Sequence, residues 1–182
     1  MKALVVLIFL FSLQTLAWNP GEIGRFDITA NPMQSGDAIE LGYSSKGLFK
    51  LREDSRHIWS VFSSLGILTY SNVITENEDK VIEVLSPELI VGIQAHANFY
   101  NDFIYQYGKV AFDTVFYDSK LRESIGIGGL LETGLEFKSS VEKMAFHIGL
   151  RWRFGLPSAS KLDGEPDPFE GSSIVFGTRF FF

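Results

Sequence analysis

The chain has 182 residues, and its 16 lysines and arginines against 22 aspartates and glutamates give a formal net charge of −6. This balance argues against nucleic acid as a partner, because binding phosphates needs a basic surface. The chain has no cysteine, which excludes disulfide bonds, thiolate metal sites and a catalytic cysteine. Mean hydropathy is nonetheless +0.12, which is high for an acidic chain.

The N-terminus has the pattern of a secretory signal peptide. Lys2 precedes an apolar run over residues 3–11, and this run is too short for a spanning helix of about 20 residues. Thr15 and Ala17 then offer small residues where a signal peptidase cuts. We therefore predict cleavage after Ala17, with a signal peptide over residues 1–17 and one domain over residues 18–182. The alternative is an uncleaved N-terminal membrane anchor.

Beyond this segment, no apolar run approaches the roughly 18 residues of a transmembrane helix. Apolar and polar residues instead alternate at period two, as they do in transmembrane β-barrels. We expect strands over residues 23–30, 37–43, 58–70, 89–99, 103–117, 125–138, 143–154 and 173–182. The first strand has the weakest pattern, and without it the count falls from eight to seven. Because bacterial barrels have an even number of strands, we predict an all-β, eight-stranded antiparallel transmembrane barrel.

The expected connections alternate in length, as the short periplasmic turns and longer outer loops of such barrels do. Counted back from the C-terminus, residues 156–171 are long, 139–140 short, 118–123 intermediate, 100–102 short, and 71–80 longer and acidic. Two irregularities are also expected. Gly47 bulges a strand that continues through residues 48–51, and Pro87 marks a bulge or a strand start because proline cannot donate to a ladder.

The strongest alternation covers residues 124–154 and predicts a hairpin. A two-residue turn at Ser139-Ser140 would fix its register. That register pairs acidic with basic residues on one face, and it pairs apolar residues on the other. It also sets small residues against large ones. The predicted pairs are Glu136 with Lys143, Glu132 with His147, Gly128 with Arg151, Gly126 with Arg153, Leu135 with Met144, Leu131 with Ile148, and Ile127 with Trp152.

An eight-stranded barrel is just wide enough for side chains to fill its interior. The polar face of the expected strands mixes both signs of charge, so the charges can pair inside. The predicted polar network is His96, Lys109, Asp113, Glu132, Glu136, Lys143, His147, Arg151, Arg153 and Arg179, with Gln94, Asn98 and Lys138 beside it. Because long charged side chains would block a passage, we expect a plugged interior and no continuous pore.

The final strand carries Gly177, Phe180 and Phe182 in the pattern Gly-x-x-Phe-x-Phe. This pattern resembles the signal that the outer-membrane barrel assembly machinery reads in Gram-negative bacteria, although Val175 stands where that signal usually has a polar residue. The layout of the whole chain resembles small outer-membrane barrels of the OmpX or OmpA-barrel kind. The resemblance implies a place in the outer membrane, with membrane lipid, lipopolysaccharide and the assembly machinery as partners. The alternative is a soluble periplasmic β protein.

Within that reading, we expect a non-catalytic structural or surface-interaction role, without a cofactor. A lipid A-modifying enzyme is the first alternative, with His147 as base and Glu132 as its orienting acid. The chain lacks a His-x-Ser-Asn element of the lipid A deacylase type, and it lacks a Gly-x-Ser-x-Gly elbow. His57 and His96 add no metal-ligand spacing. A small solute channel and a secreted β-sandwich are the remaining alternatives.

Overall fold

The computed structural model describes residues 24–33, 36–48, 57–75, 78–100, 103–117, 125–139, 143–156 and 171–182. The predicted signal peptide lies outside these ranges. All regular structure within them is β-strand, and none of the described residues forms a helix that could cross a membrane. The strands are β1 (Arg25–Met33), β2 (Gly36–Ser44), β3 (His57–Thr75), β4 (Glu78–Tyr100), β5 (Ile104–Phe116), β6 (Ile125–Lys138), β7 (Met144–Phe154) and β8 (Gly171–Phe181).

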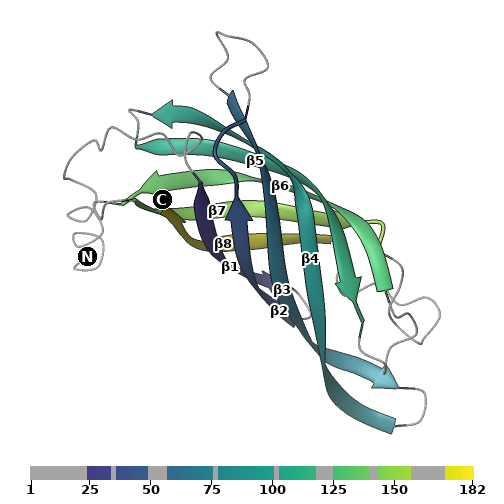
Figure 1. Cartoon of the computed structure of the whole chain (residues 1–182). Coiled ribbons are helices and arrows are strands. Elements are labelled where there is room, and N and C mark those ends of the chain that lie inside the picture. Colours follow the sequence, from purple (N-terminus) through teal and green to yellow (C-terminus); the bar gives the residue numbers. More distant parts are fainter. Residues whose placement is uncertain are drawn as a thin grey trace, which may run out of the picture.

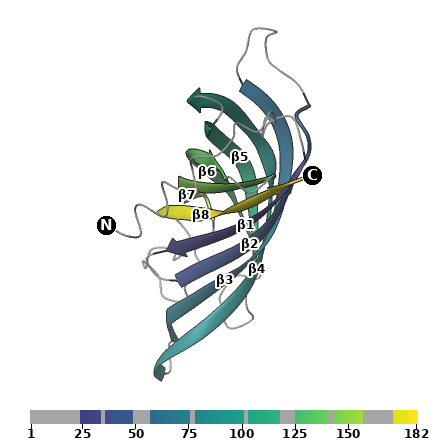
Figure 2. The same cartoon turned by 90° about the vertical axis from the view of Figure 1, so that its left-hand side faces the viewer.

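The eight strands form one closed barrel in sequence order, and each pairs antiparallel with its neighbours (Figures 1 and 2). Closure brings the last strand beside the first, where Arg25 of β1 pairs with Phe181 of β8. The predicted fold class is confirmed, including the weak first strand. A single closed barrel also excludes the sandwich alternative, which requires two packed sheets.

Alternation along each strand separates an inner from an outer face. In β5, Tyr107, Lys109 and Asp113 are buried. Phe112, between Lys109 and Asp113 on the opposite face, is 74% exposed. Glycines let large inner side chains fit, since a Cβ on Gly66 would lie 2.7 Å from Oε2 of Glu88. The interior is therefore mostly polar, and the outer surface is apolar.

The prediction for residues 71–80 is wrong, because β3 and β4 continue through most of that segment. Val73 still pairs with Ile82, beyond the last β2 pair at Tyr70. The two strands thus project beyond their neighbours as a two-stranded ribbon (Figure 1). Valine and isoleucine favour strands, and the strand preference of those in this segment prevails over the acidic residues that suggested a loop.

Two predicted irregularities also need correction. Pro87 neither bulges nor begins a strand, because the β3–β4 register runs unbroken past it. It lies one residue before the β4–β5 ladder begins at Glu88, where a missing N–H is tolerated. Gly47 and Leu48 belong to no strand, since β2 ends at Ser44. Residues 49–51 of the predicted continuation lie outside the described residues. The chain beyond still follows β3 through a hydrogen bond from Leu48 N to Trp59 O of 2.8 Å.

The predicted register of the β6–β7 hairpin is wrong. Glu136 pairs with His147, and Glu132 pairs with Arg151, so each partner lies four residues further along the chain than predicted. Ser139 N bonds to Met144 O at 2.9 Å, so the turn is longer than two residues. Serine pairs lack the left-handed preference that two-residue hairpin turns need. Lys143 supplies the positive φ, at 57°.

The same shift corrects the role of two glycines in β6. Gly126 and Gly128 do not face the two arginines, because Arg153 pairs with Leu130 and Arg151 pairs with Glu132. A Cβ on Gly126 would lie 2.6 Å from the hydroxyl of Tyr117. The glycine therefore makes room for a tyrosine. Since the register shift is an even number of residues, the side chains of β6 and β7 keep the faces that the alternation predicted.

Candidate functional site

The barrel interior is the candidate site, because it concentrates the buried charge of the described residues. Six carboxylates and six cations are buried there, so their formal charges cancel. Buried ions are tolerated when they are paired, since desolvation costs several kcal/mol per ion. The twelve are Arg25, Asp27, Glu40, Glu88, Lys109, Asp113, Glu132, Glu136, Lys138, Arg151, Arg153 and Arg179. The net charge of −6 therefore lies on residues outside this set.

The structure brings nine of the ten predicted network residues into this interior, His96 and His147 among them. Lys143 is the exception, because it is exposed in the β6–β7 turn. Asn98, named beside the network, is also exposed.

Four further charged residues of the interior were not predicted from the sequence, and all lie on the first four strands: Arg25, Asp27, Glu40 and Glu88. Their signal was present, since Glu40 stands between Ile39 and Leu41 as an inward residue should.

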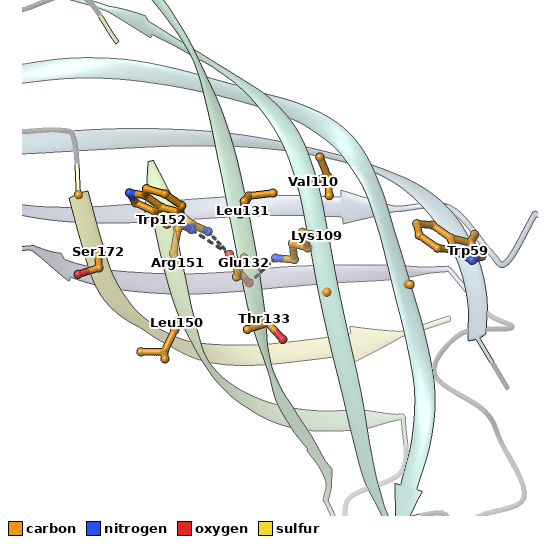
Figure 3. A pocket seen from close by; sticks show the side chains of 13 residues that line it. Trp59, Lys109, Val110, Leu131, Glu132, Thr133, Leu150, Arg151, Trp152 and Ser172 are labelled. Atoms are coloured by element: carbon orange, nitrogen blue, oxygen red, sulfur yellow. Dashed lines mark hydrogen bonds and ion pairs between the residues drawn. The ribbon is translucent and has the colours of Figure 1, made fainter. Parts of the chain in front are cut away.

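Arg151 of β7 is the centre of the first group of ion pairs, which we call the Arg151 cluster. It consists of Arg151, Glu132, Glu40 and Lys109. Nη2 of Arg151 lies 2.7 Å from Oε2 of Glu132 and donates to Oε2 of Glu40 at 2.9 Å. Nζ of Lys109 lies 3.0 Å from the other oxygen of Glu132. These contacts connect β7 to β6, β5 and β2, and Figure 3 draws part of them.

Arg153, two residues along β7, forms an adjoining group. Its Nε donates to Oδ2 of Asp113 at 2.9 Å, and its Nη2 donates to Glu88. Glu40 lies 3.5 Å from the same guanidinium, so Glu40 bridges both arginines. Nη1 of Arg153 also lies 3.1 Å from the sulfur of Met33. A carboxylate from β2 therefore contacts the two arginines of β7 across the barrel interior.

A second group, the Arg179 cluster, joins the first and last strands. It consists of Arg179, Glu136, Asp27, Arg25 and His96. Arg179 donates to Glu136, and its Nε lies 3.4 Å from Oδ2 of Asp27. Nε of Arg25 lies 3.5 Å from Oδ1 of Asp27. Nη1 of Arg25 lies 2.9 Å from Nε2 of His96, so arginine donates and the imidazole nitrogen accepts.

Tyr107 of β5 lies between the two clusters. Cζ of Arg179 is 4.2 Å from the centre of its ring, and Nζ of Lys109 is 5.6 Å from it. Cations are attracted to an aromatic face in this way. A Cβ on Gly134 would lie 2.8 Å from the tyrosine hydroxyl. Gly134 pairs with Gly149 across β6 and β7, and this glycine pair leaves the space that Tyr107 occupies.

The predicted catalytic pair is not assembled. His147 is the cross-strand partner of Glu136 and not of Glu132. Its Nε2 lies 3.3 Å from Oγ1 of Thr29. Glu132 contacts both Arg151 and Lys109, and a carboxylate that neutralises two cations is a poor orienting acid. Within the described part of the chain, no group of acidic and histidine side chains has the arrangement of a metal site.

The residues of the predicted assembly signal are on β8 and just after it. Phe180 and Phe182 are exposed on the outside, at 42% and 59%. The ring of Phe182 lies 5.3 Å from that of Phe26, centre to centre. Gly177 faces inward, where a Cβ would lie 2.7 Å from Cε1 of His147. Packing therefore explains the glycine, and recognition by the assembly machinery stays a prediction.

Comparison with known proteins assigns no family to the chain. No family model matches the chain, and no curated protein matches it. Among solved structures, it is similar to the Yersinia pestis outer membrane protein Ail in a phospholipid bilayer nanodisc. The two are 13% identical with a TM-score of 0.49, over 88% of this chain and 99% of that one.

Proposed function

We propose that the chain is an integral outer-membrane β-barrel of a Gram-negative bacterium, exported by a signal peptide cleaved after Ala17. We propose a non-catalytic role, either structural or in surface interaction through the outer loops. The observation that carries this proposal is the inverted distribution of polarity, with balanced charges inside a closed barrel and an apolar outer face. The partners we propose are membrane lipid, lipopolysaccharide and the barrel assembly machinery.

The outer face supports a place in a membrane. Every strand contributes exposed large apolar side chains, such as Ile39 at 65%, Leu65 at 66% and Ile127 at 63%. Leaving apolar surface in contact with water costs roughly 25 cal/mol per Å² relative to burying it. Monomeric soluble proteins therefore rarely expose continuous apolar patches beyond a few hundred Å². A hydrocarbon environment removes this cost, because the face then contacts lipid chains.

The interior supports a plug in preference to a channel or an enzyme. The Arg151 and Arg179 clusters connect opposite walls, so a solute would have to break ion pairs to pass. Breaking a buried ion pair costs about 3–5 kcal/mol. For the enzyme alternative, the two candidate residues are turned away from lipid chains, with His147 and Glu132 only 3% and 4% exposed.

The proposal is tested in two steps. Membrane fractionation, followed by electrophoresis with and without heating, should place the protein in the outer membrane and give a heat-dependent shift in migration. A soluble protein without such a shift would contradict the membrane assignment. In planar bilayers, a plug gives no steady conductance, whereas discrete conductance steps would favour the channel alternative.

A further inference from the structure

Described residues of the outer face line an open groove of about 900 Å³. Its floor is one row of cross-strand neighbours, in which Ala95 pairs with Gly108 and Gly108 pairs with Thr133. All three side chains are small. Trp59 pairs with Ala95 at one end, and Leu150 pairs with Thr133 at the other. The groove therefore crosses β4, β5 and β6 at a right angle to the strands.

Larger apolar side chains form the flank of this groove. Val110, Leu131 and Trp152 form the adjacent cross-strand row, and all three are exposed. Figure 3 shows Trp59 at one end of the groove and Trp152 and Leu150 toward the other, with Val110 and Leu131 on the flank and Thr133 on the floor. A smaller hollow of about 410 Å³ adjoins it and shares Thr133 and Leu150. The groove thus continues along the outer face.

The side chains of the floor offer a ligand no free polar group, and the exposed hydroxyl of Ser172 lies at the end of the groove beside Trp152. The hydroxyl of Thr133 donates to Tyr107 O at 3.2 Å, so it is already satisfied within the barrel wall. The strand residues between the floor and flank positions, Lys109, Glu132 and Arg151, are buried in the interior. A ligand without hydrogen-bonding groups fits this surface best, because a polar ligand would lose its water without compensation.

We propose that this groove holds one hydrocarbon chain of a membrane lipid. The proposal rests on the membrane location proposed above, in which lipid chains surround the outer face. A chain is thin and flexible, so it can follow a narrow groove around a curved wall. A second barrel is convex, and it would bridge the groove and leave the floor without contacts, which forfeits dispersion energy. The shape therefore favours a lipid chain over a second copy.

The test uses the full chain folded into phosphatidylcholine vesicles that contain phosphatidylcholine with a spin label near the end of one acyl chain. Electron paramagnetic resonance then separates immobilised from mobile chains. Ala95→Leu and Gly108→Leu each fill the floor. A Cβ on Gly108 has its nearest neighbour at 3.8 Å, the Glu132 carbonyl oxygen, so the larger side chain fits without strain. Ala30→Leu is the matched control, since Ala30 lies on the same outward-facing row of β1 as Phe26 and Ile28, away from the groove.

Lipid around the whole barrel gives every variant some immobilised component, and we expect this component to be larger in wild type and Ala30→Leu than in both groove variants, by about one chain per barrel. An equal component in all four proteins would overturn the proposal. A wild-type dimer that the groove variants convert to monomers, with the immobilised component unchanged, would also overturn it and would identify a second copy as the occupant. If the wild type does not enter vesicles and gives no heat-dependent shift, the proposed function fails, and this inference fails with it.

Discussion

An arginine placed on the outer face gives the sharpest test of where the barrel resides. Ile148 lies in the middle of β7 and is 50% exposed. In water, Ile148→Arg would be an ordinary surface change, within about 0.5 kcal/mol of neutral. At the midplane of a bilayer, an arginine on the lipid face costs ~2–4 kcal/mol. This cost corresponds to roughly a 30- to 900-fold loss in the folding equilibrium constant.

Phe154, the last residue of β7, provides the matched control. It lies on the same face of the same strand and is 42% exposed. Because the cost of arginine falls to about 0–1 kcal/mol near the interfaces, Phe154→Arg should change stability far less than Ile148→Arg. Leu131→Arg, at the middle of β6, should behave like Ile148→Arg.

The assay is equilibrium unfolding of each variant in phosphatidylcholine vesicles, followed by tryptophan fluorescence. Heat-dependent migration on gels gives the folded fraction independently. Equal costs at Ile148 and Phe154, or no cost at Ile148, would refute the assignment of this face to lipid. A large cost at Phe154 alone would mean that the bilayer midplane lies near Phe154 and not near Ile148.

Three further predictions concern the interior. Glu40→Ala should cost about 3–5 kcal/mol in the same unfolding assay, because it takes a buried carboxylate from two arginines; a change under 1 kcal/mol would mean that Glu40 is not a bridge. Gly126→Ala should cost ~1–3 kcal/mol through overpacking, and Tyr117→Leu in the same chain should recover part of that loss; strictly additive effects would argue against the contact. His147→Gln should leave the lipid A acyl pattern unchanged by mass spectrometry, whereas an altered pattern would revive the enzyme alternative.

Alternation predicted which way each strand faces, because inner and outer environments differ sharply in polarity. Lys109 and Phe112 of β5 were assigned to opposite faces, and they lie there. The same rule located β1, although its pattern is weak. Facing depends only on the parity of a residue along its strand, and it survives errors in turn length.

Cross-strand partners could not be predicted as well, because they depend on turn geometry. The partner of Glu132 changes from His147 to Arg151 when the turn after β6 is longer than two residues. This turn requires a left-handed backbone at Lys143, and a lysine does not predict that conformation. The candidate pair of His147 and Glu132 depended on that turn, and it failed for that reason.

The interior of the first four strands was missed for a different reason. Asp27 has Arg25 two residues away on β1, whereas β2 offers Glu40 no basic residue. Their other partners are Arg179 and Arg151 on the last two strands. Ion pairs between such distant segments carry no local signature, and only closure of the barrel brings their members together.

The distance along the chain between Glu40 and Arg151 has a consequence for folding. The two residues are 111 positions apart, so the carboxylate enters the sheet long before its guanidinium partner if strands join in order. A barrel that lacked β7 and β8 would hold Glu40 without Arg151 and Arg153, and Asp27 without Arg179. Seam closure and neutralisation of the interior are therefore one event, and a half-formed barrel would hold uncompensated charge in its cavity.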